Sequence, residues 1–183
     1  MSSLSVYHES SPELPNKVLN HLEDIVGTLA ALRVHFARWQ ATAPLTAGAS
    51  EQEMIAAFRP QLDALMGEGG YRTCELISHS DGQTQQAETR ILQPIERREA
   101  EDQAHFLVLG RGLYCLHIDE YVYAVLCEKG DLLGIPAGTR HWVDMGERPH
   151  FIGIQLRGDA QGIAAGASGN DIASRFPRLD DWS

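Results

Sequence analysis

The spacing of apolar residues changes near residue 71. Before that point, apolar side chains recur every three or four positions over residues 13–33 and 50–70, which predicts two helical regions. Pro60 interrupts the second region, so we expect either a kink or a new helix start there. Two short stretches, 6–10 and 35–41, are predicted to be strands.

After residue 71 the apolar segments are short, rich in β-branched and aromatic residues, and separated by tight turns. They cover residues 71–80, 105–109, 113–118, 121–127, 131–136 and 150–156. Closely spaced strands of this kind predict an antiparallel barrel or sandwich. We therefore expect a mainly β fold with flanking α-helices, in which six to eight strands form a barrel and the N-terminal helices pack outside it.

The length of 183 residues is that of one domain with a core of ordinary size. In the expected organisation this single domain spans residues 1–183. Residues 1–70 form an N-terminal elaboration of helices and strands, residues 71–157 form the barrel core, and residues 158–183 form a C-terminal segment with a short polar helix.

Charge and composition narrow the classes of partner. The formal net charge is −10, so a nucleic-acid backbone would be repelled. The N-terminus lacks the basic and apolar regions of a signal peptide, and no apolar run is long enough to span a membrane. The three cysteines form no CxxC pair. We expect a cytoplasmic protein with reduced thiols and a small-molecule substrate. The residues leave the oligomeric state open.

One segment has a specific spacing. Residues 130–146 read GDLLGIPAGTRHWVDMG, which is Gly, five residues, Pro, any residue, Gly, two residues and His. This is the second sequence motif of the cupin barrels. Gly130 suits a turn into a strand, and Pro136 and Gly138 suit a tight turn that directs His141 back into the barrel. We predict that His141 points into a functional site.

The first cupin motif reads His, any residue, His, three residues, Glu, six residues, Gly. Gly110 fits its last position, and counting back places Gln103 at the glutamate position. The two histidine positions are then Glu99 and Arg97. The spacing is kept, but three of the four expected metal ligands are absent.

Almost the whole chain resembles the acireductone dioxygenases of bacterial methionine salvage. The resemblance is carried by SSPELPNKVL, GLYCLHIDEYVYAVLCEKGDL, IPAGTRHWVDMG and NDIASRFP. It implies a cupin fold and one Fe(II) or Ni(II) ion held by three histidines and a glutamate. In such enzymes the metal chelates the enediolate of the substrate, which reacts with O2. Only His141 carries over as a ligand, and Gln155 stands where these enzymes often have arginine.

The departures weaken a metal site in its original geometry. Arginine stays protonated and has no lone pair to give a metal. A guanidinium about 4 Å from a metal ion also repels it by about 4 kcal/mol per unit of ion charge at an effective dielectric near 20. We therefore expect that Arg97 and Gln103 break the ancestral site.

Three hypotheses follow for the altered site. In the first, the chain retains the acireductone dioxygenase activity of methionine salvage through a rebuilt iron triad of Glu99, His105 and His141. Residues two apart share a strand face, so His105 lies on the same side as Gln103. In the second, the enzyme is metal-free: Arg97 binds an enolate or carboxylate, Glu99 or His141 acts as general base, and Gln103 donates a hydrogen bond. Isomerisation, elimination or hydrolysis of a small polar acid would be its chemistry.

The third hypothesis is a non-catalytic relative, which is a metal-free cupin that binds a ligand or a partner, or a paralogue that is losing its function. We favour an enzyme that resembles acireductone dioxygenase and acts on a small polar metabolite. For this enzyme, a site that holds Fe(II) or Ni(II) and a site without metal are two equally supported hypotheses. By analogy with the family, Phe106, Trp142 and Gln155 are expected as walls of the pocket. Cys115 and His117 alternate onto one strand face, which we interpret as packing.

Overall fold

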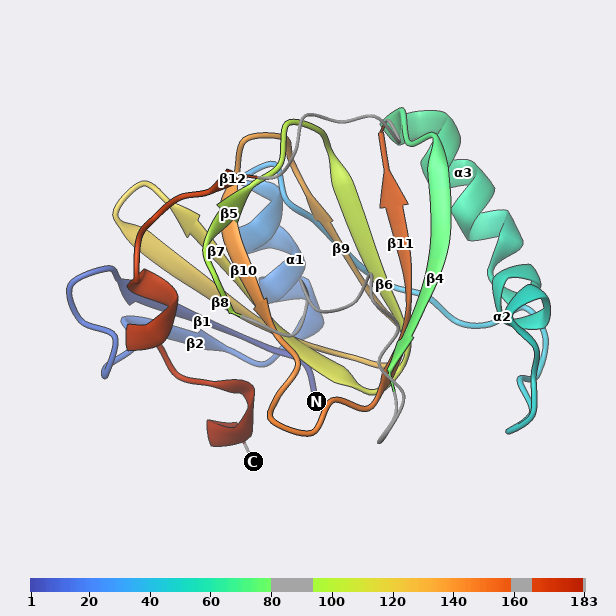
Figure 1. Cartoon of the computed structure of the whole chain (residues 1–183), viewed down its shortest axis with the longest axis horizontal. Helices are drawn as coiled ribbons and strands as arrows, with labels where there is room; N and C mark the ends of the chain where they lie inside the picture. Colours follow the sequence, from blue (N-terminus) through green and yellow to red (C-terminus); the bar gives the residue numbers. More distant parts are fainter. Residues whose placement is uncertain (80–93, 159–165, 183) are drawn as a thin grey trace.

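The computed structural model describes residues 1–79, 94–158 and 166–182 (Figure 1). The helical elements in this part of the chain are α1 (Leu22–Ala30), α2 (Glu51–Ala57), α3 (Arg59–Gly69) and the 3-10 turns η1 (Ile172–Arg175) and η2 (Leu179–Asp181). The strands are β1 (Ser3–His8), β2 (Lys17–Leu19), β3 (His35–Arg38), β4 (Thr73–His79), β5 (Arg97–Arg98), β6 (Gln103–Leu109), β7 (Arg111–Ile118), β8 (Tyr121–Glu128), β9 (Asp131–Ile135), β10 (Arg140–Asp144), β11 (Phe151–Arg157) and β12 (Gly166–Ala167).

The strands form two antiparallel sheets that face each other (Figure 1). The first sheet has the order β12-β5-β10-β7-β8-β1-β2, and the second has the order β3-β9-β6-β11-β4. This is the mainly β cupin architecture that the sequence predicts. More strands are present than the expected six to eight, because β1, β2 and β3 from the N-terminal region and the short β5 and β12 extend the two sheets.

Three apolar layers follow from the two-residue period of the strands. The inner layer lies between the sheets and includes Leu107, Leu116 and Leu133, with Ile25 and Leu29 of α1 packed into it. The outer face of the first sheet is covered by the C-terminal turns η1 and η2. The outer face of the second sheet is covered by α2 and α3, which therefore pack outside the barrel as expected.

The predicted helix over residues 13–33 is wrong in its first half. Residues Lys17–Leu19 form β2, which pairs with β1, and the helix spans only Leu22–Ala30. Val18 is 52% exposed, so its apolar side chain does not mark a helix face turned to the core. The open edge of β1 offers backbone hydrogen bonds that this segment satisfies as a strand.

The interruption at Pro60 is a new helix start. Phe58 ends α2 and Pro60 occupies the first turn of α3, where its missing N–H costs no hydrogen bond. The capping box of Ser50 and Glu53 is formed in both directions. Ser80, the last residue of the strand predicted over 71–80, lies outside the described residues. Within the described ranges, no helix has the length and hydropathy of a membrane span.

A buried carboxylate anchors the C-terminal segment to the first sheet. Asp144 at the end of β10 is 1% exposed. Its carboxylate accepts hydrogen bonds from Arg178 Nε at 2.5 Å, Arg178 Nη2 at 3.4 Å, Leu179 N at 3.1 Å and Gly146 N at 2.9 Å. Burial raises the pKa of Asp144, but these hydrogen bonds outweigh it, and the pKa is lowered overall. The carboxylate is therefore held ionised beneath η2.

We expect Asp144→Asn to destabilise the protein by about 2–3 kcal/mol, because in either orientation the amide N–H groups would face two of the four donor groups. Arg178 is 45% exposed, which keeps the loss below that of a fully buried pair. The thermal midpoint should fall by roughly 5–10 °C. As a matched control, Asp63→Asn removes an exposed carboxylate 3.9 Å from Arg59 and should leave the midpoint almost unchanged. Equal midpoints for the two variants would contradict the anchoring role.

Candidate active site

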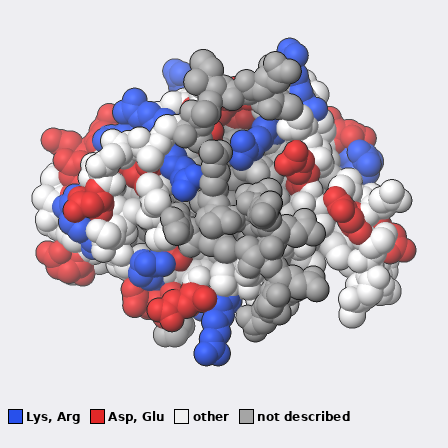
Figure 2. Space-filling view, viewed as in Figure 1, with Lys and Arg blue, Asp and Glu red and all other residues white. Residues whose placement is uncertain are grey.

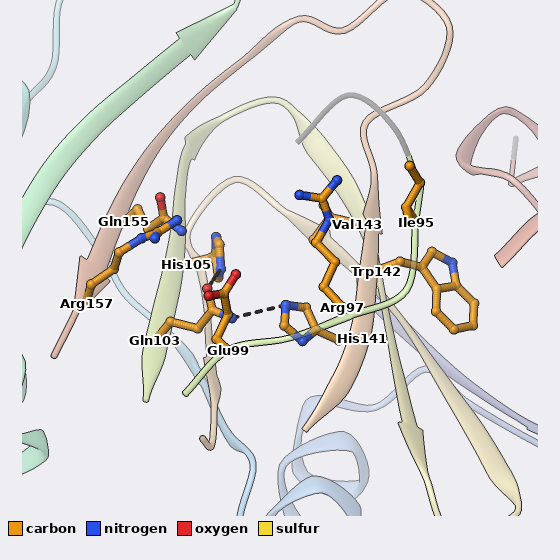
Figure 3. Close-up of a pocket in the computed structure, with 10 residues that line it drawn as sticks. All are labelled: Ile95, Arg97, Glu99, Gln103, His105, His141, Trp142, Val143, Gln155 and Arg157. Carbon is orange, nitrogen blue, oxygen red and sulfur yellow. Dashed lines mark hydrogen bonds between the residues drawn. The ribbon is translucent and has the colours of Figure 1, made fainter. Parts of the chain in front are cut away.

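A polar cavity of about 60 Å³ lies between the two sheets and holds room for a few water molecules (Figure 3). It receives side chains from β5, β6, β10 and β11 and from the segments on either side of β5. Its lining consists of Ile95, Arg97, Glu99, Gln103, His105, His141, Trp142, Val143, Gln155 and Arg157.

Strand pairing brings these distant residues together. His141 on β10 lies directly opposite Arg97 on β5, and Arg157 on β11 lies opposite Gln103 on β6. The turn before β10 depends on Gly138, whose φ of 78° favours glycine. Its N–H donates to the carbonyl of Glu99 at 2.8 Å, so the two cupin-like segments hold each other in place.

A chain of hydrogen bonds crosses the cavity through Gln103. His141 Nδ1 lies 2.9 Å from the carbonyl oxygen of Thr139, which can only accept, so Nδ1 carries the proton. The Nε2 lone pair of His141 then accepts from the Gln103 amide nitrogen at 3.0 Å. The amide oxygen of Gln103 in turn accepts from His105 Nε2 at 3.1 Å. Each partner has the donor or acceptor that its neighbour needs when both histidines are neutral.

The electrostatics of the cavity keep both histidines neutral. Burial, the neighbouring His141 and Arg157 lower the pKa of His105 to about 3. His105 is half-buried by exposed area, but its ring lies inside the cavity among protein atoms, so loss of hydration dominates. Burial also lowers the pKa of His141. The Thr139 carbonyl and Glu99 oppose this shift, and Arg97 adds to it.

Two guanidinium groups and one carboxylate give the cavity its charge. In Figure 3 Arg97 and Arg157 stand on opposite sides, and the Glu99 carboxylate points toward the middle beside Gln103 and His105. Such a site presents positive charge to a small anion and places a carboxylate within its reach.

The structure brings together seven of the residues that the sequence singled out: Arg97, Glu99, Gln103, His105, His141, Trp142 and Gln155. The sequence motifs did not point to Arg157, Ile95 or Val143. Arg157 could have been found, since it lies two residues after Gln155 on the same strand and therefore on the same face.

Phe106 does not line this cavity, whereas Trp142 lines it without turning its indole toward the polar side chains. Phe106 is fully buried on the opposite face of β6 from Gln103 and His105, with its ring 4.6 Å from that of Phe58. Trp142 is among the lining residues, but its indole points away from the polar side chains in Figure 3 and packs against Phe176. The alternation of strand faces places both rings in outer apolar layers.

A second buried network lies just behind the cavity, and no sequence pattern pointed to it, since His117 was interpreted as packing. His117 on β7 is 3% exposed, and its two ring nitrogens contact Glu96 Oε2 at 2.6 Å and Glu9 Oε2 at 2.9 Å. Glu96 is 1% exposed and immediately precedes Arg97. The network therefore fixes the segment that carries Arg97 into the cavity.

The residues present do not fit an Fe(II) or Ni(II) centre. The Nε2 lone pair of His141 accepts from an amide, His105 Nε2 carries a proton, and Arg97 presents positive charge from the facing strand. Within residues 1–79, 94–158 and 166–182, no three His, Cys, Asp or Glu side chains form a group that could hold a metal ion. The rebuilt triad of Glu99, His105 and His141 is therefore not assembled in this structure.

Comparisons with known proteins converge on one family. Residues 4–159 match the family model described as the ARD/ARD' family. A protein of Pseudomonas syringae pv. syringae named acireductone dioxygenase is 58% identical over 181 residues, covering 99% of this chain and all of that one. One of the same name from Stutzerimonas stutzeri is 56% identical with the same coverage.

The solved structure of an acireductone dioxygenase from Bacillus anthracis, with a cadmium ion in its active centre, superposes with a TM-score of 0.76. The superposition covers 91% of this chain and 98% of the other, at 18% identity, and it shows a shared fold.

The neutral histidines predict a pH-dependent stability. Because the pKa of His105 is about 3 in the folded protein and 6.5 without burial, the unfolded chain binds its proton first as the pH falls. Stability is then fully present above pH 6.5 and is lost toward pH 3, by up to about 1.4 kcal/mol per pH unit. Urea denaturation of wild type and His105→Gln between about pH 7 and pH 4 measures this loss, which should be smaller in the variant.

His150→Gln serves as the control, because His150 is exposed and lies outside the cavity. It should follow the wild-type curve. An unchanged pH dependence in His105→Gln would show that His105 does not stay neutral in the folded protein.

Proposed function

The chain belongs to the ARD/ARD' family of acireductone dioxygenases, and on that premise we propose that its cavity binds a small enolisable carboxylic acid and transfers protons on it without a resident metal. The observation that carries the proposal is the hydrogen bond from the Gln103 amide to His141 Nε2, formed opposite a strand that presents Arg97. A guanidinium takes the place that a cation has in a metal-dependent relative.

Binding rests on the two arginines. Arg157 binds the carboxylate of the substrate and donates hydrogen bonds to it at the exposed side of the cavity. Arg97 faces the carbonyl oxygen deeper inside. Because the cavity is small and partly filled by Gln103, the substrate has few atoms or displaces the amide from its bridge. Ile95 and Val143 supply apolar lining, so the substrate contacts only a small apolar surface there.

The proton transfer rests on Glu99. Its carboxylate removes a proton from the carbon next to the carbonyl group, and the electron pair of that C–H bond moves onto the carbonyl oxygen. Arg97 stabilises the resulting enolate, as a metal ion would. The protonated Glu99 then gives a proton to the enolate oxygen, which yields the enol, or back to the same carbon, which exchanges its hydrogen with solvent. Gln103, held between two neutral histidines, orients an enolate oxygen through the amide N–H that is not donated to His141.

A second candidate is retained acireductone oxidation. It is favoured by 58% identity over 99% of the chain to a protein named acireductone dioxygenase. The two functions differ in whether the protein needs Fe(II) or Ni(II), and metal content separates them.

We expect the wild-type protein, purified without chelator and then exposed anaerobically to Fe(II) or Ni(II), to retain less than about 0.1 metal ion per chain, since its donors do not fit either ion. The triple variant Arg97→His, Glu99→His, Gln103→Glu restores the full cupin ligand set around His141 and should bind close to one ion. Elemental analysis after gel filtration measures both. Near-stoichiometric metal in wild type that disappears in His141→Ala would favour the second candidate.

Proton transfer is tested by deuterium exchange. With hydroxypyruvate and 2-oxobutyrate as probes in D2O, wild type should accelerate exchange at the enolisable carbon over the enzyme-free rate. Glu99→Gln should lose about 100-fold or more of that acceleration, because the base is gone. Proton NMR follows the signal loss, with Glu13→Gln, at an exposed position, as the control. Exchange that survives in Glu99→Gln, or that never exceeds the background, would contradict this function.

A further inference from the structure

A second cavity of about 470 Å³ lies on the outer face of the first sheet, behind the polar cavity. Arg98 points there because successive residues of β5 face opposite sides, and Arg97 occupies the inner side. The residues that matter for its chemistry are Glu96, Arg98, Arg140, Ser168 and Asn170.

Two arginines meet across neighbouring strands at this cavity. The register that pairs Arg97 with His141 places Arg98 opposite Arg140. Like charges in direct cross-strand positions are destabilising. In the described part of the chain neither guanidinium has a carboxylate partner, and Arg140 Nη2 donates only to the carbonyl of Asp119 at 3.2 Å. The protein as a whole carries a net charge of −10, so the pair is a local exception that an anion would stabilise.

A buried acceptor lies beneath the arginines. Glu96 is 1% exposed, its Oε2 atom contacts His117, and its Oε1 atom has no hydrogen-bond partner among the described residues. An unpaired buried carboxylate oxygen is costly and calls for a donor. Sulfate supplies no such donor at neutral pH, and the negative charge of either sulfate or phosphate would be repelled by Glu96. A ligand that satisfies the whole cavity therefore carries an anionic group and a donor group together.

The remaining wall leaves space and hydrogen-bond donors for a small polar molecule. The short β12 contributes glycine and alanine, and a Cβ added at Gly166 would meet no atom within 4 Å, so space is left beside the arginines. Asn170 Oδ1 accepts from Ile172 N, which leaves its amide N–H groups for a ligand. Basic side chains appear on the surface of Figure 2 where β5 and β12 lie in Figure 1.

We propose that this outer cavity is a binding site for a zwitterionic α-amino acid. Its carboxylate bridges Arg98 and Arg140, and its ammonium group donates to Glu96 Oε1, which is covered in the free protein, when the Glu96 side chain turns toward the cavity. The proposal is independent of the reaction in the polar cavity, since none of these three side chains lines that cavity.

Isothermal titration of the full-length protein tests it. L-alanine, L-serine and L-leucine are the zwitterionic probes, propionate and lactate are matched acids without the ammonium group, ethylamine lacks the carboxylate, and inorganic phosphate is a plain anion. At least one amino acid should bind saturably and at least tenfold more tightly than its matched acid. Arg98→Gln and Arg140→Gln should each weaken that binding tenfold or more, and Arg148→Gln, at an exposed position elsewhere, should not.

Glu96→Gln should remove the preference for the amino acid over the matched acid. If that variant does not fold, the two arginine variants decide alone, because Arg98 is exposed and Arg140 is half-buried. No saturable binding of any of the three amino acids, equal binding of phosphate or a plain acid, or unchanged binding in both arginine variants would overturn the proposal.

Discussion

The contact between the Glu96 carboxylate and the His117 ring holds the part of the chain on which both cavities depend. Strand β5 has two residues and shares a single register pair with β10, so its backbone pairing alone gives little stability. Glu96 bonds His117 at 2.6 Å from a position that is almost fully buried. Removing one partner of such a pair leaves a buried group uncompensated, which typically costs about 3–5 kcal/mol. The pair therefore sets the position of β5.

Because β5 is fixed at Glu96, the alternation of its side chains has two consequences. Arg97 and Glu99 enter the space between the sheets, while Glu96 and Arg98 face the outer side. Backbone bonds from Ser168 N to the Glu96 carbonyl and from Gly138 N to the Glu99 carbonyl tie the same segment to its neighbours on both sides. A shift of one residue would exchange the inner and outer sets and would place Arg98 opposite His141. The register of this short strand is thus a condition for the chemistry proposed at either cavity.

The inner site is predictable from sequence where the spacing of glycines fixes geometry. Gly110 and Gly138 anchor two turns, and counting from them is enough to place Arg97, Gln103 and His141 in one cavity. The Glu96–His117 contact has no such signal, because it joins residues 21 positions apart through a strand pairing that no local pattern encodes.

The same limit applies to residues 13–33. Their apolar spacing suits a helix, yet residues in their first half form β2, because the edge of β1 needs a partner. Phe106 is a different case, because the two-residue period that places Gln103 and His105 inside already puts its ring outside, and only the analogy with the family suggested otherwise.

The departures from the cupin ligand pattern depend on one another. A glutamate at position 103 would place a carboxylate against the Nε2 lone pair of a neutral His141, and two acceptors would then repel. The amide of Gln103 removes that conflict, because it donates to His141 and accepts from His105. An amide carries no charge, so it does not neutralise a metal ion, and Arg97 on the facing strand can keep its own charge free for an anion. Gln103 and Arg97 are thus consistent with each other and with neutral histidines, and neither is consistent with the ion that the family pattern was built to hold. That mutual consistency supports the proposal that the site binds an anionic ligand and has not only lost its metal.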